Sequence, residues 1–224
     1  MSSTEPGARS EPFADRRDAG RQLAARLGAL VGKQTVVVAL PRGGVPVADE
    51  VAAALDAPLE ILAVRKLGAP HNPEYGIGAV AEDGTCVIDA EAVEVLGIRN
   101  DELEAIVARE SAELVRRVAA YRGDRPPLDL EGRTAVVVDD GVATGLTDTA
   151  ALRAVRQMGP QRLVLAVPVC APDALVRLRA EADEVVCLRV PRLLRGVSQY
   201  YRDFSQVSDE EVLHDLQHRA DAAA

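Results

Sequence analysis

Short apolar runs rich in β-branched residues alternate with segments of helical periodicity along most of the chain. Five such runs lie at residues 35–40, 59–64, 134–138, 162–168 and 184–190. Parallel strands buried on both faces have continuous apolar sequences, and the connections between them are usually helical. The pattern therefore predicts an α/β fold, a doubly wound and mostly parallel five-stranded sheet flanked by helices.

Apolar residues at helical spacing place helices between these strands and at both ends of the chain. The expected helices cover residues 13–30, 45–55, 90–96, 101–121, 146–158 and 174–182, and a last helix starts near Ser208, where Glu211 completes a capping box. Residues 1–11 are expected to form a disordered tail because they are rich in Ser, Glu, Pro and Gly. The main domain is then expected at 12–207, with a helical insertion at 89–130, and residues 208–224 form a C-terminal helix and tail.

Residues 67–84 interrupt the alternation with repeated glycine and proline. They are consistent with a mobile loop or a hairpin that precedes a short strand at 85–88. Loops of this length in compact domains usually have a function.

Charge and hydropathy exclude several classes of protein. With 35 acidic and 26 basic residues the chain has a net charge of −9, which argues against nucleic-acid or anionic membrane partners. No apolar run approaches the roughly 18 residues that a membrane span requires. The N-terminal sequence lacks a basic and then apolar segment typical of a secretory signal, so a cytoplasmic location is expected.

The most informative segment is the sequence VVVDDGVATGLT at residues 136–147. An apolar strand ends in Asp139 and Asp140, a turn of small residues follows, and a helix begins at Leu146 or Thr147. Ligands of open α/β sheets bind beyond the carboxyl ends of strands, and the free N–H groups of a helix start attract anions. Thr144 adds a hydroxyl, and two carboxylates suit vicinal hydroxyls or a divalent cation. A phosphorylated ribose with Mg²⁺ fits this combination, although the acid pair could also serve only to end a strand and cap a helix.

This segment resembles the phosphoribosyl pyrophosphate (PRPP) signature of the type I phosphoribosyltransferases. The resemblance implies that the ribose and its 5′-phosphate bind Asp139, Asp140, Gly141, Val142, Ala143, Thr144, Gly145, Leu146 and Thr147. It also implies Mg²⁺ as cofactor, held by Asp139 and Asp140 largely through the substrate and water, and a fold with a small hood made by the chain ends.

Further motifs resemble the same family in the same order. The turn Pro41-Arg42-Gly43-Gly44 resembles its pyrophosphate loop, and Arg65-Lys66 resembles the basic pair at the root of its flexible catalytic loop. The loop sequence Glu74-Tyr75-Gly76 resembles that of adenine phosphoribosyltransferases. The resemblance implies that Arg42, Gly43, Gly44 and Lys66 bind pyrophosphate, and that Lys66, Glu74 and Asp140 are catalytic.

Two features of this sequence differ from those of the better known type I phosphoribosyltransferases. Ala143 replaces the aspartate that 6-oxopurine enzymes usually hold, which disfavours hypoxanthine or guanine, and the insertion at 89–130 leaves adenine unestablished. The chain looks closest to a bacterial group of undefined acceptor, which shares a tail like residues 199–204. Tyr200 and Tyr201 in that tail either stack on the acceptor or dock on the core. Family members commonly form homodimers.

The resemblance implies a Mg²⁺-dependent transfer of 5-phosphoribosyl from PRPP to a nucleobase or similar small nitrogenous acceptor, with release of pyrophosphate. Two alternatives stay open: a protein that senses PRPP or a nucleotide without catalysis, and a hydrolase of a phosphorylated substrate on the same fold. No basic or helix-turn-helix-like segment favours a DNA-binding regulator.

Overall fold

The main sheet has the five predicted strands. The computed structural model describes residues 11–28, 34–123 and 128–222. Its parallel sheet has the order β2-β1-β6-β7-β8. The strands are β1 (Thr35–Ala39), β2 (Leu59–Ile61), β6 (Thr134–Val138), β7 (Arg162–Val169) and β8 (Glu184–Arg189). The order steps outward from β1 in both directions, which is the doubly wound arrangement expected from the sequence.

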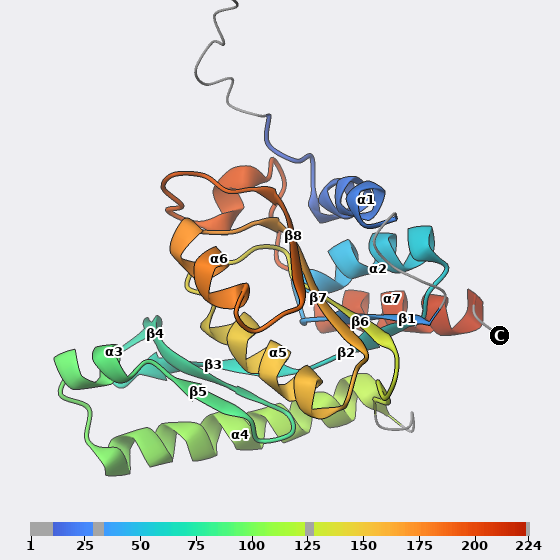
Figure 1. The fold of residues 1–224 in the computed structure, drawn as a ribbon. Helices are drawn as coiled ribbons and strands as arrows, with labels where there is room; N and C mark the ends of the chain where they lie inside the picture. The colour runs from blue at the N-terminus through green and yellow to red at the C-terminus, as the bar shows by residue number, and fades with distance from the viewer. Residues whose placement is uncertain (1–10, 29–33, 124–127, 223–224) are drawn as a thin grey trace, which may run out of the picture.

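Helices cover both faces of this sheet (Figure 1). One face carries α1 (Arg16–Leu27), α2 (Gly44–Leu55) and α7 (Asp209–Ala222), and the other carries α5 (Leu146–Gln157) and α6 (Pro172–Leu178). Successive strand residues point to opposite faces, so Val37 packs with α1 and α2 while Val36 and Val38 pack with α5. This two-sided burial explains the uninterrupted apolar runs in the sequence.

A second, antiparallel sheet lies beside the first. It has the order β3-β4-β5, with β3 (Val64–Ala69), β4 (Asn72–Ala81) and β5 (Cys86–Ile88). The prediction of a single strand over 59–64 is wrong, because the main-sheet strand ends at Ile61 and Val64 starts β3. From Leu67 to Ala69 buried and more exposed residues alternate, which suits a sheet with one covered face. Of the two alternatives for residues 67–84, the structure adopts the hairpin.

The helical insertion covers the second sheet. It comprises α3 (Ala90–Val95) and α4 (Asn100–Arg122), and residues 124–127 lie outside the described part of the chain. Ile106 and Leu114 of α4 pack in one apolar cluster with Leu67 and Ile77 of the hairpin. The insertion therefore provides the apolar support that lets β3 and β4 form an ordered hairpin.

Residues 13 and 14 contact residues 200–203, so segments near the two ends of the chain lie together where a hood is expected. Phe13 N–H donates to the carbonyl of Tyr200 at 2.8 Å, and Arg202 N–H donates to the carbonyl of Phe13 at 2.8 Å. A 3₁₀ helix, η1 (Val197–Tyr200), precedes this contact. The expected disorder at 1–11 falls, apart from Glu11, outside the described residues.

The last helix begins with the predicted capping box. Glu211 N–H donates to Ser208 Oγ at 3.1 Å, and Ser208 N–H donates to the Glu211 carboxylate at 2.7 Å. Val212 and Leu216 are buried in the same apolar cluster as α1 and α2, so α7 contributes to the main core. Among the helices that the structure describes, none is long and apolar enough to cross a membrane.

Candidate functional site

Two of the predicted motifs lie side by side at the carboxyl edge of the main sheet. β1 and β6 are parallel neighbours, with Ala39 opposite Val138, so the turns that follow them share one edge. A Cβ added to Gly43 would lie 2.0 Å from Asp140 Oδ2, and one added to Gly44 would lie 2.6 Å from the carbonyl oxygen of Val138. Only glycine allows this close packing of the 41–44 turn against the acid pair.

The acid pair, Asp139 and Asp140, is partly buried, and the protein engages one oxygen of each carboxylate. Asp139 Oδ1 accepts a hydrogen bond from the backbone N–H of Asp140 at 2.8 Å. Asp140 Oδ2 accepts one from Arg16 Nε at 2.8 Å. Within the described residues the second oxygen of each carboxylate accepts no hydrogen bond. Two acceptor oxygens are thus left for hydroxyl groups or a hydrated cation.

Burial makes the two negative charges of the acid pair costly. Desolvation raises the pKa of Asp139 well above its ordinary value, and the neighbouring Asp140 carboxylate raises it further. Desolvation also raises the pKa of Asp140, while Arg16 acts in the opposite direction. A ligand that brings hydroxyl donors or positive charge relieves this cost, so the acid pair is matched to such a ligand.

The turn after the acid pair leads into the start of α5, where Gly145 is buried and Leu146 and Thr147 are partly exposed. Gly145 has φ +77° and forms the N-cap of α5, a conformation that favours glycine. Thr149 Oγ1 donates to the Gly145 carbonyl at 2.8 Å and fixes the first turn. The N–H groups of that turn lack intrahelical partners and carry partial positive charge. Ala143 and Thr144 are exposed and line a cavity of about 730 Å³.

A buried carboxyl under this turn was not identified from the sequence. Asp148 is 3% exposed, and its Oδ1 has no hydrogen-bond partner among the described residues. Burial raises the pKa of Asp148 to about 7. The available signal was a charged residue between two threonines at the start of the helix, just before the small and apolar residues Ala150, Ala151 and Leu152.

The pyrophosphate-loop candidate Arg42 is approached by two elements that the sequence did not connect with it. Its Nη1 lies 3.7 Å from Oδ1 of Asp209, the first residue of α7. The hydroxyl of Tyr121, near the end of α4, donates to the same Asp209 oxygen. Burial raises the pKa of Tyr121 to about 12. The insertion and the C-terminal helix thus converge beside the 41–44 turn.

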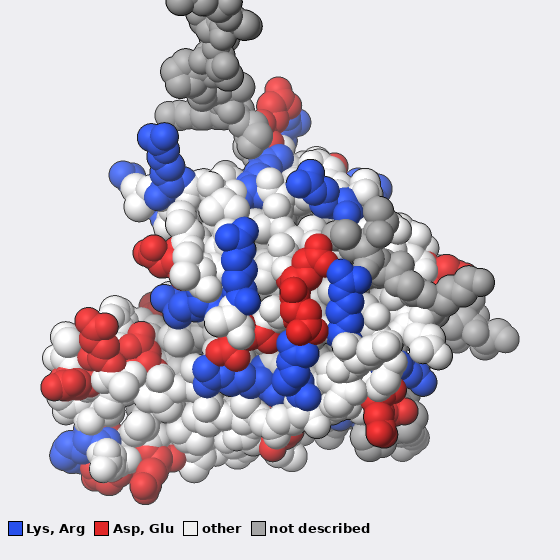
Figure 2. All heavy atoms as spheres, in the orientation of Figure 1, with Lys and Arg blue, Asp and Glu red and all other residues white. Residues whose placement is uncertain are grey.

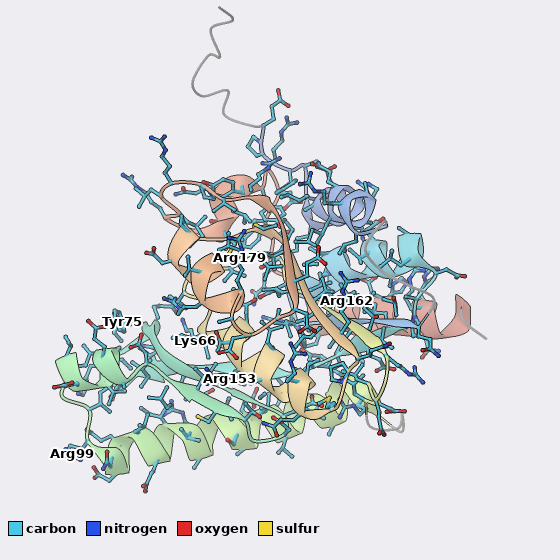
Figure 3. The ribbon with its side chains drawn as sticks, in the orientation of Figure 1. Lys66, Tyr75, Arg99, Arg153, Arg162 and Arg179 are labelled. Carbon is cyan, nitrogen blue, oxygen red and sulfur yellow. The ribbon has the colours of Figure 1, made fainter. Side chains whose placement is uncertain are left out.

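The catalytic-loop candidates lie on the β3–β4 hairpin. Lys66 Nζ donates to the backbone carbonyl of Glu74 at 2.9 Å, and the Glu74 carboxylate lies 3.9 Å from it. The Glu74 side chain is 96% exposed. Figure 3 places Tyr75 at the outer end of the hairpin, farther from the main sheet than Lys66. Within the described residues no hydrogen bond or ion pair joins Lys66 or Glu74 to the acid pair.

The tail tyrosines have different surroundings. Tyr201 is 6% exposed, and its hydroxyl donates to the backbone carbonyl of Asp140 at 2.5 Å. Its ring lies between those of Phe13 and Phe204, with centroids 5.4 and 5.0 Å away. Burial raises the pKa of Tyr201. In this structure Tyr201 docks on the core, while Tyr200 is only partly buried.

Charges of both signs are interspersed on the face that carries α5 (Figure 2). Arg153 pairs with Glu181 at 2.6 Å, and Arg156 pairs with Asp183 at 2.9 Å. Paired charges of this kind give no extended field of one sign on this face.

Comparisons with known proteins agree on one family. The family model described as "Phosphoribosyl transferase domain" matches residues 16–202. A Mycobacterium tuberculosis (strain H37Rv) protein named "Putative phosphoribosyl transferase Rv0571c" is 49% identical over 201 residues, which are 90% of this chain and 45% of that protein. The chain thus spans slightly under half the length of the curated relatives it matches.

Solved structures give the same picture of the fold. The crystal structure of TT1426 from Thermus thermophilus is 47% identical, with a TM-score of 0.77, and the match covers 92% of this chain and 98% of that one. AQ2163 from Aquifex aeolicus is 14% identical with a TM-score of 0.50, over 80% of this chain and 77% of that one, and shows likeness of fold alone.

Proposed function

Since the chain belongs to the phosphoribosyl transferase domain family, we propose that it is a Mg²⁺-dependent phosphoribosyltransferase. In the proposed reaction a nitrogen of a nucleobase or similar small acceptor attacks C1 of PRPP. The bond from C1 to the diphosphate oxygen breaks, its electron pair leaves with pyrophosphate, and the acceptor nitrogen loses a proton. The observation that carries this proposal is the acid pair with one unengaged oxygen on each carboxylate, followed by the small-residue turn that starts α5.

In the proposed binding mode, each part of PRPP binds a different segment at the carboxyl edge of the main sheet. Asp139 and Asp140 accept hydrogen bonds from the ribose hydroxyls, and the turn at 141–147 binds the 5′-phosphate through its free N–H groups and the hydroxyls of Thr144 and Thr147. Arg42 and the backbone of Gly43 and Gly44 receive the diphosphate. The close approach of Gly43 to Asp140 supports this assignment, because it puts the 41–44 turn beside a carboxylate that is proposed to bind the ribose.

The residues present fit a magnesium ion that is shared with the substrate. Mg²⁺ prefers carboxylate and water oxygens and usually takes only one or two carboxylates from a protein when phosphates supply the rest. Asp139 and Asp140 offer two such oxygens, and the described residues contain no group of three or more potential metal ligands. When bound, the ion would neutralise charge on the departing diphosphate. The two carboxylates would hold it largely through water and the ribose hydroxyls.

Lys66 and Glu74 need the hairpin to move toward the sheet edge. In the proposed closed state the Lys66 ammonium stabilises the diphosphate, and Glu74 accepts or donates the proton at the reacting groups. In this structure the two side chains are exposed and contact each other across the hairpin. This supports a catalytic role that they take up only when the hairpin closes over the substrate. Tyr200, and Tyr201 if it leaves the core, are the weaker candidates for acceptor contact.

A sensor without catalysis is the second candidate function. It is favoured by the exposure of the Glu74 carboxylate, which makes no contact with the acid pair among the described residues. Hydrolysis of a phosphorylated substrate would use the same phosphate turn and acid pair. The proposal includes PRPP and a small nitrogenous acceptor as ligands, and assembly into a homodimer. It also includes a cytoplasmic location.

One experiment separates these functions. The purified chain is incubated with PRPP, Mg²⁺ and a panel of nucleobases and other amines, and pyrophosphate and ribosylated products are measured by mass spectrometry. Pyrophosphate released only with an acceptor supports transfer, release without one supports hydrolysis, and saturable binding without turnover supports sensing. Absence of both binding and turnover contradicts the proposal.

A further inference from the structure

Arg16, the first residue of α1, reaches the acid pair from the far end of the sequence. Its Nε donates to Asp140 Oδ2 at 2.8 Å, across 124 positions of the chain. Both side chains are largely buried, with 11% and 14% exposure. A charge-assisted hydrogen bond in such surroundings is short, strong and directional.

Residues 199–205, called the aromatic tail from here on, hold the guanidinium of Arg16 on two further sides. Nη1 donates to the backbone carbonyl of Ser205 at 2.8 Å, and Cζ lies 3.8 Å from the ring centroid of Phe204. The Phe204 ring packs on Tyr201, whose hydroxyl donates to the backbone carbonyl of Asp140. The tail therefore acts on Asp140 in two ways. The Tyr201 hydroxyl bonds the backbone carbonyl of Asp140, and Phe204 and Ser205 hold Arg16, which bonds the Asp140 carboxylate.

The same arrangement restricts the Asp140 carboxylate to one orientation. Oδ2 lies between Arg16 and the backbone of Gly43, at a position where even a methyl group on Gly43 would collide with it. Rotation of the carboxylate would break the bond to Arg16. Oδ1 is the oxygen left for a ligand, and a ligand that meets a fixed acceptor loses less freedom on binding than one that must order it.

We propose that Arg16 is a positioning residue, which holds Asp140 Oδ2 so that Oδ1 meets a ribose hydroxyl of PRPP, and that the aromatic tail keeps Arg16 in place. This inference rests on the proposed function. It gives the tail residues Tyr201 and Phe204 a role in PRPP binding through Arg16 and Asp140.

The neighbouring Arg17 provides a matched control. It pairs with Asp49 at 2.7 Å and with Asp215 at 2.8 Å, and both of these carboxylates are buried. Loss of either arginine removes ion pairs that join α1 to the rest of the fold. Of the two arginines, Arg16 alone contacts the acid pair, so the two variants separate positioning from stability.

The test measures the Kd of Mg²⁺·PRPP by isothermal titration calorimetry for the full chain and its variants. Arg16→Gln should weaken binding about 10-fold to 30-fold, and Arg16→Lys should recover part of that loss because it keeps the charge but not the second donor toward Ser205. Arg17→Gln should leave the Kd within about twofold even where its Tm falls as much as that of Arg16→Gln. Should Arg16→Gln not fold, Arg16→Lys against Arg17→Lys gives the same comparison, with about a threefold difference expected.

The outcomes distinguish this inference from the function on which it rests. Binding by the wild type together with an unchanged Kd in the folded Arg16 variants overturns the positioning role and leaves the proposed function intact. No binding of Mg²⁺·PRPP by the wild type overturns both. Weakening by Arg16→Gln and Arg17→Gln alike would show a purely structural effect and would also overturn the inference.

Discussion

The acid pair and the β3–β4 hairpin carry the proposed binding and catalytic groups, and the structure holds them in very different ways. Asp140 is 14% exposed and is fixed by Arg16, by Tyr201 and by close packing on Gly43. On the hairpin, the Lys66 and Glu74 side chains are 44% and 96% exposed. The difference indicates a site whose ribose-binding part is preformed while its catalytic part completes on closure. Substitutions in the two regions should then affect different steps.

The largest effect is expected from Asp140→Ala. The variant loses a charged acceptor for a ribose hydroxyl and leaves the Arg16 guanidinium buried without its carboxylate. Mg²⁺·PRPP affinity should fall at least about 100-fold, equivalent to about 2.8 kcal/mol. Calorimetric titration measures the change, and Asp101→Ala serves as the exposed control. An unchanged affinity would refute the assignment of the acid pair to the ribose.

Lys66→Ala should separate catalysis from binding. If the Lys66 ammonium meets the diphosphate only after closure, its loss lowers kcat about 100-fold, while the Kd of Mg²⁺·PRPP changes by less than about threefold. Steady-state rates with an acceptor found in the product screen give kcat, and titration gives Kd. A Kd that rises as much as kcat falls would contradict the contrast between the two regions, because it would place Lys66 against the substrate before closure.

The main sheet and the phosphate turn could be predicted from the sequence because local patterns determine them. Two-sided burial gives apolar runs such as residues 35–39, and the small residues around Gly145 reflect a close backbone turn with positive φ. The predicted extent of the second strand was wrong. Residues 59–64 form one nearly continuous apolar run in the sequence, but the chain passes from the main sheet to the second sheet within it. No local pattern marks that change.

The partners of the acid pair could not be predicted for a different reason. Arg16 and Tyr201 are distant from Asp140 in sequence, and only the packing of the chain ends brings them together. The same holds for Asp209 beside Arg42. The sequence indicated a turn at residues 41–44, but nothing in it indicated that Gly43 packs against Asp140.

The support of the hairpin can be weakened without touching its proposed catalytic groups. Arg65 pairs with Glu110 of α4 at 2.6 Å, and the Glu110 side chain is 12% exposed. Because Arg65 is only partly buried, Glu110→Ala should cost about 2 kcal/mol, below the range for fully buried pairs. Hydrogen exchange should become faster in residues 64–81 and stay unchanged in β6. Equal acceleration in both sheets would show that the hairpin and the main sheet unfold together.

The smallest effect is expected at Asp148, where the preformed part of the site carries a buried carboxyl. Its pKa of about 7 lies above the ordinary value, so its ionisation destabilises the fold progressively between about pH 4 and pH 7, and the full cost is present above pH 7. Asp148→Asn removes the ionisation but leaves a buried amide. The free energy of unfolding of the variant, relative to wild type, should therefore increase by about 1 to 2 kcal/mol from pH 6 to pH 8. Urea unfolding at the two pH values measures this difference. A constant difference would mean that Asp148 is ionised in the folded protein at both pH values, and that the preformed turn does not hold a carboxyl with a raised pKa.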